Sequence, residues 1–316
     1  MNNFNKLDRV LFFISAFILC SSFTAWSQKS VYQNVSLQEN MIQNESLFSP
    51  FSTFSPDQNA FAEIQRTIQS AVFLKFDKTI NSGIRNNATE YLNLNIPISI
   101  DREINLNLYQ FQLLKEENSV RTSSGIEYKE TGSYFHGIVN GSATSLVSVS
   151  SFDDEIIIMF QFNGEQYRIA PIDKENDTYI LFKTADIAEH NPFDCHTDMR
   201  EHLIGNSLDA EVREANPLNC VNMYLEVDND IYVDKGSVAA TSNFITAVMN
   251  EVAILYNNDA IEFGVNQMLI WDTNDPYNGP STGNYLDQFR NALNGNYNGD
   301  LAHLIGYGGG GGIAYV

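Results

Sequence analysis

The sequence predicts an α+β protein with two parts, a β-rich part followed by a part in which strands and helices alternate. Between residues 61 and 190, short segments alternate apolar and polar residues with period two, which is typical of half-buried strands. After residue 218, apolar strands alternate with segments whose apolar residues recur at i, i+3, i+4 and i+7. The chain has 316 residues, which is long enough for two domains.

Residues 1–27 have the three-part order of a secretory signal peptide. Lys6 and Arg9 precede the apolar run VLFFISAFILC, which is too short to span a bilayer, and small residues follow at Ala25 and Ser27. We expect cleavage near Ser27 and a secreted protein. The alternative is a short membrane anchor or a buried helix.

The charge of the chain excludes two classes of partner. Its formal net charge is −21 at pH 7, which opposes binding to nucleic acid or to an anionic membrane through long-range repulsion. With 43% hydrophobic and 18% charged residues, the composition is that of a globular protein. We therefore expect no nucleic-acid partner and no membrane partner.

Residues 28–60 are polar and contain Pro50 and Pro56, and we expect a loosely ordered segment there. The β-rich part, residues 61–190, contains five strand-like segments, EYLNLNIPISI, INLNLYQFQLL, SLVSVSSF, EIIIMFQF and EQYRIAPI. The turn motifs DD and NGE separate the last three, so we expect a sandwich or a similar antiparallel unit. Residues 191–217 have mixed charge and two prolines, which indicates a connector.

In residues 218–316 the predicted elements are strands and two helices. The segments CVNMYLEVD, IEFGVNQMLIW, GDLAHLIGY and GGIAYV read as strands. The first helix covers VAATSNFITAVMNEVAILYNN and the second covers TGNYLDQFRNAL. The apolar face of the first helix consists of Phe244, Ile245, Val248, Met249, Val252, Leu255 and Tyr256.

These residues resemble a known family. The run CVNMYLEVDNDIYVDKGSVAATSNFITAVMNEVAILYNNDAIEFGVNQMLIWDTNDPY, followed by NGDLAHLIGY and GGGIAYV, is similar to the start of a reprolysin-like (adamalysin/ADAM-type) zinc metalloprotease domain of secreted bacterial type. The run YFHGIVNGSATSLVSVSSFDDEIIIMFQFNGEQYRIAPI is similar to the propeptide of such proteases. The resemblance implies a metzincin-type α/β domain, in which a mixed sheet carries two helices. It also implies a propeptide that packs on its own catalytic domain, and a protein or peptide substrate.

The zinc chemistry of that family resides in HExxHxxGxxH, in which three histidines bind zinc and the glutamate is the general base. The chain has no such motif. No two of its histidines have i, i+4 spacing; they are His136, His190, His196, His202 and His303. We expect Zn²⁺ in the full-length family member but no zinc ligand and no catalytic residue here. The chain thus resembles a precursor fragment, with the propeptide and the first half of a protease domain, and as given it is expected to be inactive.

The resemblance implies roles for six residues. Gly311, Gly312, Ile313 and Ala314 would form the edge strand above the active-site cleft, to which substrate backbone adds as a further strand. The alternative is a flexible glycine loop before an ordinary strand. Asp300 would help to bind a structural Ca²⁺, with Asn222 near the partner position on the first strand. The alternative for Asp300 is a plain turn residue.

Cys195 lies near the end of the expected propeptide, where related precursors carry a cysteine that ligates and blocks the zinc. His196 follows it where the family usually has glycine. A disulfide between Cys195 and Cys220 is a second reading, and pairing of Cys220 with a cysteine outside this chain is a third. His303 is expected to be a packed core or rim histidine.

Two functions of different class remain open. The first is the N-terminal fragment of a secreted metalloendopeptidase precursor. The second is a non-catalytic secreted binding or adhesion protein, or a pseudoenzyme, with a metzincin-like remnant; the lack of any metal motif favours it.

Overall fold

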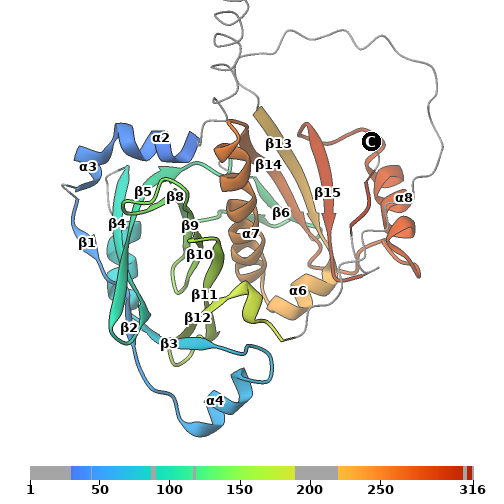
Figure 1. Cartoon of the computed structure of the whole chain (residues 1–316). Coiled ribbons are helices and arrows are strands. Elements are labelled where there is room, and N and C mark those ends of the chain that lie inside the picture. The colour runs from blue at the N-terminus through green and yellow to red at the C-terminus, as the bar shows by residue number, and fades with distance from the viewer. Residues whose placement is uncertain are drawn as a thin grey trace, which may run out of the picture.

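The computed structural model describes residues 30–43, 45–86, 90–116, 119–188, 220–308 and 312–314. In these ranges the chain forms one sheet of ten strands and one of five. Figure 1 shows the large curled sheet formed by the N-terminal half and the smaller sheet formed mainly by the C-terminal part, with helix α7 (Val238–Asn258) between them. The predicted α+β class is confirmed.

The large sheet has the order β1-β4-β5-β8-β9-β10-β11-β12-β3-β2. The β1–β4 pair is parallel, and the other pairs are antiparallel. Its strands are β1 Leu47–Phe48, β2 Phe51–Thr53, β3 Ala71–Phe76, β4 Tyr91–Ser99, β5 Arg102–Phe111, β8 Ser133–Val139, β9 Leu146–Ser151, β10 Ile156–Phe162, β11 Glu165–Asp173 and β12 Thr178–Lys183.

The period-two patterns place one face of this sheet in a core. Leu94 of β4 lies opposite Leu106 of β5, and both side chains are fully buried. The turn between β10 and β11 follows the predicted chemistry, since Asn163 and Gly164 have φ values of 53° and 79°. Two such residues make the tight turn that matches the twist of a hairpin. All five strand segments predicted for this part are confirmed.

The prediction of a loosely ordered segment at residues 28–60 is wrong for the part that the structure describes. Their described part forms helices α2 (Ser30–Leu37) and α3 (Glu39–Gln43) and strands β1 and β2. Val31, Val35 and Ile42 are at most 2% exposed and pack in one cluster with residues of β8 and β10. Because Val31 and Val35 are four residues apart, α2 has an apolar stripe that the polar average composition hides.

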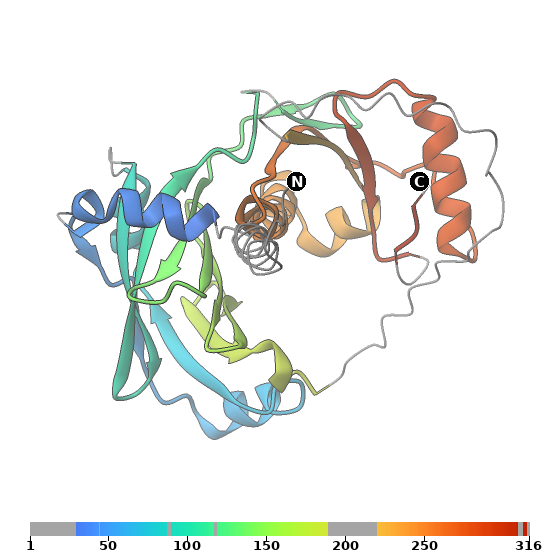
Figure 2. The same ribbon diagram turned by 45° about the horizontal axis from the view of Figure 1, so that its top comes forward.

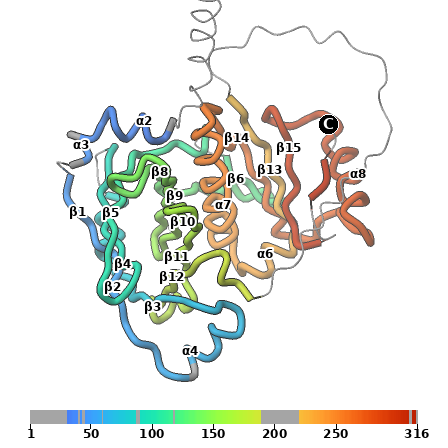
Figure 3. Tube along the Cα trace, viewed as in Figure 1, coloured from blue at the N-terminus to red at the C-terminus, as the bar shows by residue number. Residues whose placement is uncertain are grey.

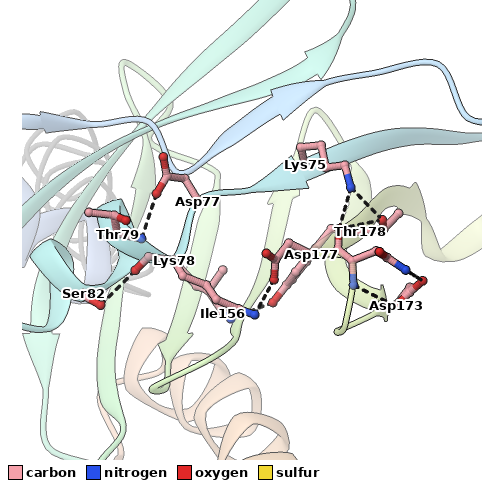
Figure 4. Close-up of polar contacts among 11 residues, drawn as sticks. Lys75, Asp77, Lys78, Thr79, Ser82, Ile156, Asp173, Asp177 and Thr178 are labelled. Atoms are coloured by element: carbon pink, nitrogen blue, oxygen red, sulfur yellow. Dashed lines mark hydrogen bonds and ion pairs between the residues drawn. The ribbon is translucent and has the colours of Figure 1, made fainter.

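Helices α4 (Gln58–Ile64) and α5 (Lys78–Arg85) flank β3 in the sequence, and a 3-10 turn at Thr184–Asp186 follows β12. Helix α5 begins at a capping carboxylate (Figure 4). Asp77 accepts hydrogen bonds from the backbone N–H of Thr79 at 2.8 Å and of Ile80 at 3.1 Å. Lys78 extends from its first turn to an ion pair with Asp177, at 2.6 Å.

The second sheet has the order β15-β13-β14-β6-β7. Strand β13 pairs in parallel with β14 and β15, and β6 pairs in parallel with the far side of β14. Its strands are β6 Val120–Thr122, β7 Glu127–Tyr128, β13 Cys220–Val227, β14 Glu262–Ile270 and β15 Leu301–Ile305. Strands β6 and β7 come from the stretch between β5 and β8, so part of the expected β-rich region belongs to the other sheet (Figure 2).

Both predicted helices of this part are confirmed, α7 at Val238–Asn258 and α8 at Thr282–Leu293, and the structure adds a short helix, α6 (Asn229–Lys235). Helices α7 and α8 cover opposite faces of the sheet. Successive side chains of β13 point alternately to these two faces. Leu225 packs in the core with residues of α7, whereas Tyr224 packs with Phe289 of α8.

By length and composition, α7 is the helix of the described part that is apolar enough to cross a membrane. Its most apolar window has a mean hydropathy of 1.4, and 56% of that window is buried inside the molecule. This partial burial is typical of a core helix. Figure 3 shows α7 between the strands of the two sheets.

The face of α7 toward the large sheet is largely polar. Asn250 donates to the carbonyl of Val149 and to Ser150 Oγ, both at 3.0 Å. Asn243 donates to Glu155 Oε1 at 2.9 Å, and Glu251 forms an ion pair with Arg168. The helix therefore joins the two parts through these hydrogen bonds and through apolar packing, which includes Ile254 against Ile138 and Met159.

Candidate functional site

The structure brings together the two residues predicted to bind calcium. Asn222 lies on β13, and Asp300 directly precedes β15, which pairs with β13. The backbone N–H of Asn222 donates to Asp300 Oδ2 at 2.8 Å, and the N–H of Asp300 donates to the Asn222 carbonyl at 2.7 Å. These bonds explain the proximity without a metal, and the calcium role stays a prediction.

A close backbone approach supports this junction. A Cβ at Gly299 would lie 2.8 Å from the Asn222 carbonyl oxygen and 2.8 Å from the Tyr224 nitrogen, so only glycine fits there without a shift of β13. Within the described ranges, no group of three or more His, Cys, Asp or Glu side chains is arranged to hold a metal ion. Calcium takes six to eight oxygen ligands, and Asn222 and Asp300 supply only a few of them.

The predicted substrate edge strand is not a strand in the described residues. Gly312, Ile313 and Ala314 have no regular secondary structure, and Gly311 lies outside the described residues. Strand β15 ends at Ile305 and is the last strand on its side of the sheet. Among the described residues, Gly312, Ile313 and Ala314 do not pair with β15, so they lack the backbone hydrogen bonds that would define a strand. The substrate-binding role of these residues stays a prediction.

The histidines described by the structure do not fit a zinc site. His136 is fully buried on β8, and its Nε2–H donates to Asn250 Oδ1 at 2.9 Å while Nδ1 accepts from Asn257 at 3.2 Å. Burial lowers the pKa of His136 to about 3, so its ring is neutral. His303 lies on the edge strand β15 and its side chain is exposed, which fits a rim position and not the core. His190, His196 and His202 lie outside the described residues.

The cysteine predictions are not tested. Cys195 lies outside the described residues, and with it the proposed switch and the Cys195–Cys220 disulfide. Cys220 is exposed and free within the described part, at the first position of β13. Its Sγ accepts a hydrogen bond from the Asn222 side chain at 3.4 Å.

A cluster of carboxylates that was not predicted from the sequence lies where β13 ends. Glu226 is 3% exposed and accepts three hydrogen bonds, from Tyr224 Oη at 2.8 Å, Trp271 Nε1 at 2.9 Å and Tyr277 Oη at 2.7 Å. No cation is needed, because neutral donors satisfy this carboxylate from both the sheet and the loop after β14. Burial and the adjacent carboxylate raise the pKa of both tyrosines.

Asp228, two residues further on, is 4% exposed, and its Oδ1 has no hydrogen-bond partner. Burial, followed by the charges of Asp275, Asp230 and Glu226, raises the pKa of Asp228 to about 7. Its carboxyl group lies against Gly306, directly after β15. The segment LEVDND could have predicted this cluster. Its acidic residues directly follow an apolar strand, and the carboxyl ends of parallel strands meet at one edge of a sheet.

A cavity of about 830 Å³ lies where the chain leaves the large sheet after β5. Its lining includes Tyr91, Phe111, Lys115, Glu130 and Tyr134. Neither Asn222 nor Asp300 borders it, so it is separate from the predicted calcium site.

Comparison with known proteins bears on the C-terminal part. Residues 218–316 match the sequence model of a family described as Metallo-peptidase family M12 (Reprolysin_5). No curated protein matches the chain. Among solved structures, the chain is similar to metalloproteinase-II from Bacteroides fragilis, with 13% identity and a TM-score of 0.40. That alignment covers 68% of this chain and 62% of the other. The predicted resemblance to a reprolysin-like metallopeptidase is thus confirmed for residues 218–316.

Proposed function

We propose that this chain is the N-terminal part of a secreted, zinc-dependent metalloendopeptidase precursor. Residues 1–27 would be the signal peptide, the β-rich part the propeptide and residues 218–316 the first half of the catalytic domain. The observation that carries the proposal is the family match over 218–316, a segment that folds into parallel strands β14, β13 and β15 with a helix on each face.

The chemistry proposed for the full-length protein is hydrolysis of peptide bonds by a zinc-activated water. The M12 family is generally zinc-dependent. The HExxHxxGxxH motif is not among these 316 residues, and the described residues hold no set of side chains that fits zinc. We therefore assign no catalytic step to any residue of this chain, and peptide hydrolysis is proposed for a longer protein that contains it.

The contacts of α7 support the propeptide role. Residues 61–190 contact α7 through Glu155, His136 and Arg168, and a propeptide must contact its own catalytic domain to act on it. The polar side chains on this face of α7 can form hydrogen bonds with water as well as with the large sheet. This is expected of a helix face that is exposed to water once the propeptide is removed.

The test is the reading frame downstream of Val316. We expect HExxH within roughly the next hundred residues, and its absence would refute the proposal. The extended protein should hydrolyse an unstructured protein substrate after removal of the β-rich part, and a chelator or a Glu→Gln change in HExxH should abolish this activity. The 316-residue chain assayed in parallel should be inactive with added Zn²⁺.

The second candidate is a non-catalytic secreted binding protein with a metzincin-like remnant. Its motivation is that no HExxH motif occurs among the 316 residues. This reading predicts no HExxH downstream and a stable 316-residue product, and these two results together would replace the first proposal.

A further inference from the structure

One stretch of the β-rich half is built into the other sheet. We call residues 113–115 and 119–128 the arm; they lie between β5 and β8 in the sequence and include β6 and β7. The arm pairs with the outer edge of β14, on the side opposite β13 (Figure 2). The two halves of the molecule are thus joined by a strand contact as well as by the face of α7.

Backbone hydrogen bonds hold the arm along most of β14. The N–H of Lys115 donates to the Val265 carbonyl at 3.0 Å, and the N–H of Val265 donates to the Leu113 carbonyl at 2.9 Å. Further along, the N–H of Met268 donates to the Ser119 carbonyl at 2.6 Å. The N–H of Ser123 donates to the Ile270 carbonyl at 2.9 Å. This is strand addition, in which the main chain supplies the binding contacts.

Two side chains of the arm are anchored in the core of the second sheet. Leu113 and Val120 are both 0% exposed and pack in the same cluster as Val265, Met268 and residues of α7. Burial of two aliphatic side chains opposes their withdrawal into water.

A charged clamp closes the far end of the arm. Asp272, two residues after β14, accepts hydrogen bonds from Ser124 N–H at 2.9 Å, Ser124 Oγ at 2.5 Å and Ser123 Oγ at 2.8 Å. Although burial alone would raise it, these hydrogen bonds lower the pKa of Asp272 to about 2. Hydrogen bonds to an ionised acceptor are stronger than neutral ones, so the clamp fixes the register of β6.

The other contact between the halves has different chemistry. Along α7 it combines hydrogen bonds and ion pairs, such as Asn243–Glu155 and Glu251–Arg168, with apolar packing at Ile254 and around Tyr134 and Phe152. The net contribution of each polar contact is modest, because water satisfies the same groups after separation. The arm adds paired backbone, buried apolar anchors and a charged clamp to this polar face.

We propose that the arm retains the β-rich half on residues 220–308 after the connector, residues 191–217, is cut. Cleavage of the connector alone then does not free the second half, and release requires peeling β6 from β14 or cuts at both ends of the arm. This inference rests on the proposed function in one respect, namely that the β-rich half is a detachable propeptide.

The test places the recognition sequence of a specific protease in the connector of the full chain. After complete cleavage, both pieces should co-elute in size-exclusion chromatography without denaturant. Asp272→Ala should raise the dissociation constant of the cut complex roughly tenfold to a hundredfold, through loss of hydrogen bonds to a charged acceptor. Arg168→Gln is the comparison on the α7 face, because it removes an ion pair with the mostly buried Glu251 and leaves the arm intact; it should raise the dissociation constant less than Asp272→Ala does, since a glutamine amide can still donate to Glu251.

Separation of the cut, otherwise unchanged chain would overturn the proposal, as would release by Arg168→Gln without release by Asp272→Ala. Thermal unfolding of each uncut variant shows whether it folds. If Asp272→Ala does not fold, Ser124→Ala takes its place, because it removes only one side-chain donor to Asp272. It should also raise the dissociation constant of the cut complex, and an unchanged value would contradict the proposed role of the arm. The reading-frame test is independent, since co-elution stands whether or not HExxH follows.

Discussion

Replacing Glu226 tests whether the buried carboxylate organises the end of the second sheet. Glu226→Ala leaves three donors, on Tyr224, Trp271 and Tyr277, without an acceptor in a site that is closed to water. A hydrogen bond to a charged group contributes about 1.5–3 kcal/mol, but the three are not additive, and removing the charge recovers its desolvation cost. We expect a net loss of about 3–5 kcal/mol in the free energy of unfolding.

Glu226→Gln should cost less, about 1–2 kcal/mol, because an amide keeps one acceptor oxygen and Tyr224 can turn to accept from its nitrogen. The assay is urea unfolding followed by tryptophan fluorescence. In a chain that begins at Gln28, Trp271 is the sole tryptophan and lies in contact with Glu226.

The control is Glu165→Gln on β11. Glu165 pairs with Lys183 at 3.6 Å with both side chains substantially exposed, and its loss should change stability by less than about 0.5 kcal/mol. A loss below about 1 kcal/mol for Glu226→Ala would refute the reasoning, since buried donors without partners would then carry no penalty.

Three further changes probe other sites. The folded-state pKa of Asp228 is raised from 3.8 to about 7, so its stabilising contribution is present below pH 4 and is lost as the pH rises through 7. Asp228→Asn should therefore gain about 1–2 kcal/mol in urea unfolding at pH 8 and nothing at pH 4; an equal gain at both would contradict the assignment. Asn250→Ala removes the acceptor of His136 and should cost about 2–3 kcal/mol in thermal unfolding, whereas a loss under about 0.5 kcal/mol would show that water replaces it. Gly299→Ala should cost about 1–3 kcal/mol, against no loss for Gly283→Ala, whose added Cβ meets nothing closer than 3.8 Å; equal effects would rule out the close approach.

Local pattern was sufficient for the elements that carry strong periodicity. The bounds of α7 and α8 match the predicted segments, because apolar spacing inside and capping or turn residues outside point to the same ends. Strands β4 and β5 follow from strict alternation. Strands β3, β8 and β12 were not predicted, since apolar runs without alternation do not distinguish a strand from a buried helix.

Long-range pairing could not be predicted from local pattern. Nothing in the sequence around Val120 indicates that it pairs with Met268, because a three-residue strand takes its partner from tertiary context. The polar face of α7 was missed for a similar reason. Asn243 and Asn250 are seven residues apart and buried, whereas Leu255 and Tyr256, which were expected on the apolar face, are 50% and 42% exposed. Which side of a helix meets a polar partner depends on a sheet that forms a hundred residues earlier in the chain.

The meeting of Asn222 and Asp300 was predicted only through a family resemblance, and the structure supplies the reason in the parallel pairing of β13 with β15. The carboxylate cluster at Glu226 and Asp228 depends on the return of the loop after β14, which brings Tyr277 and Asp275 to the end of β13. No local sequence pattern predicts that this loop folds back to the end of β13.

The position of the arm has a consequence for the order of assembly during synthesis. Residues of β5 and β8 can pair as soon as both have been made, but β6 must wait for β14, which begins at Glu262. Until then Leu113 and Val120 have no core to enter, and a nascent chain would expose an unpaired strand beside a finished hairpin. A contact of such sequence separation forms slowly, so the last step of folding should be the docking of the two halves, and the interval before it is when the chain is most prone to self-association.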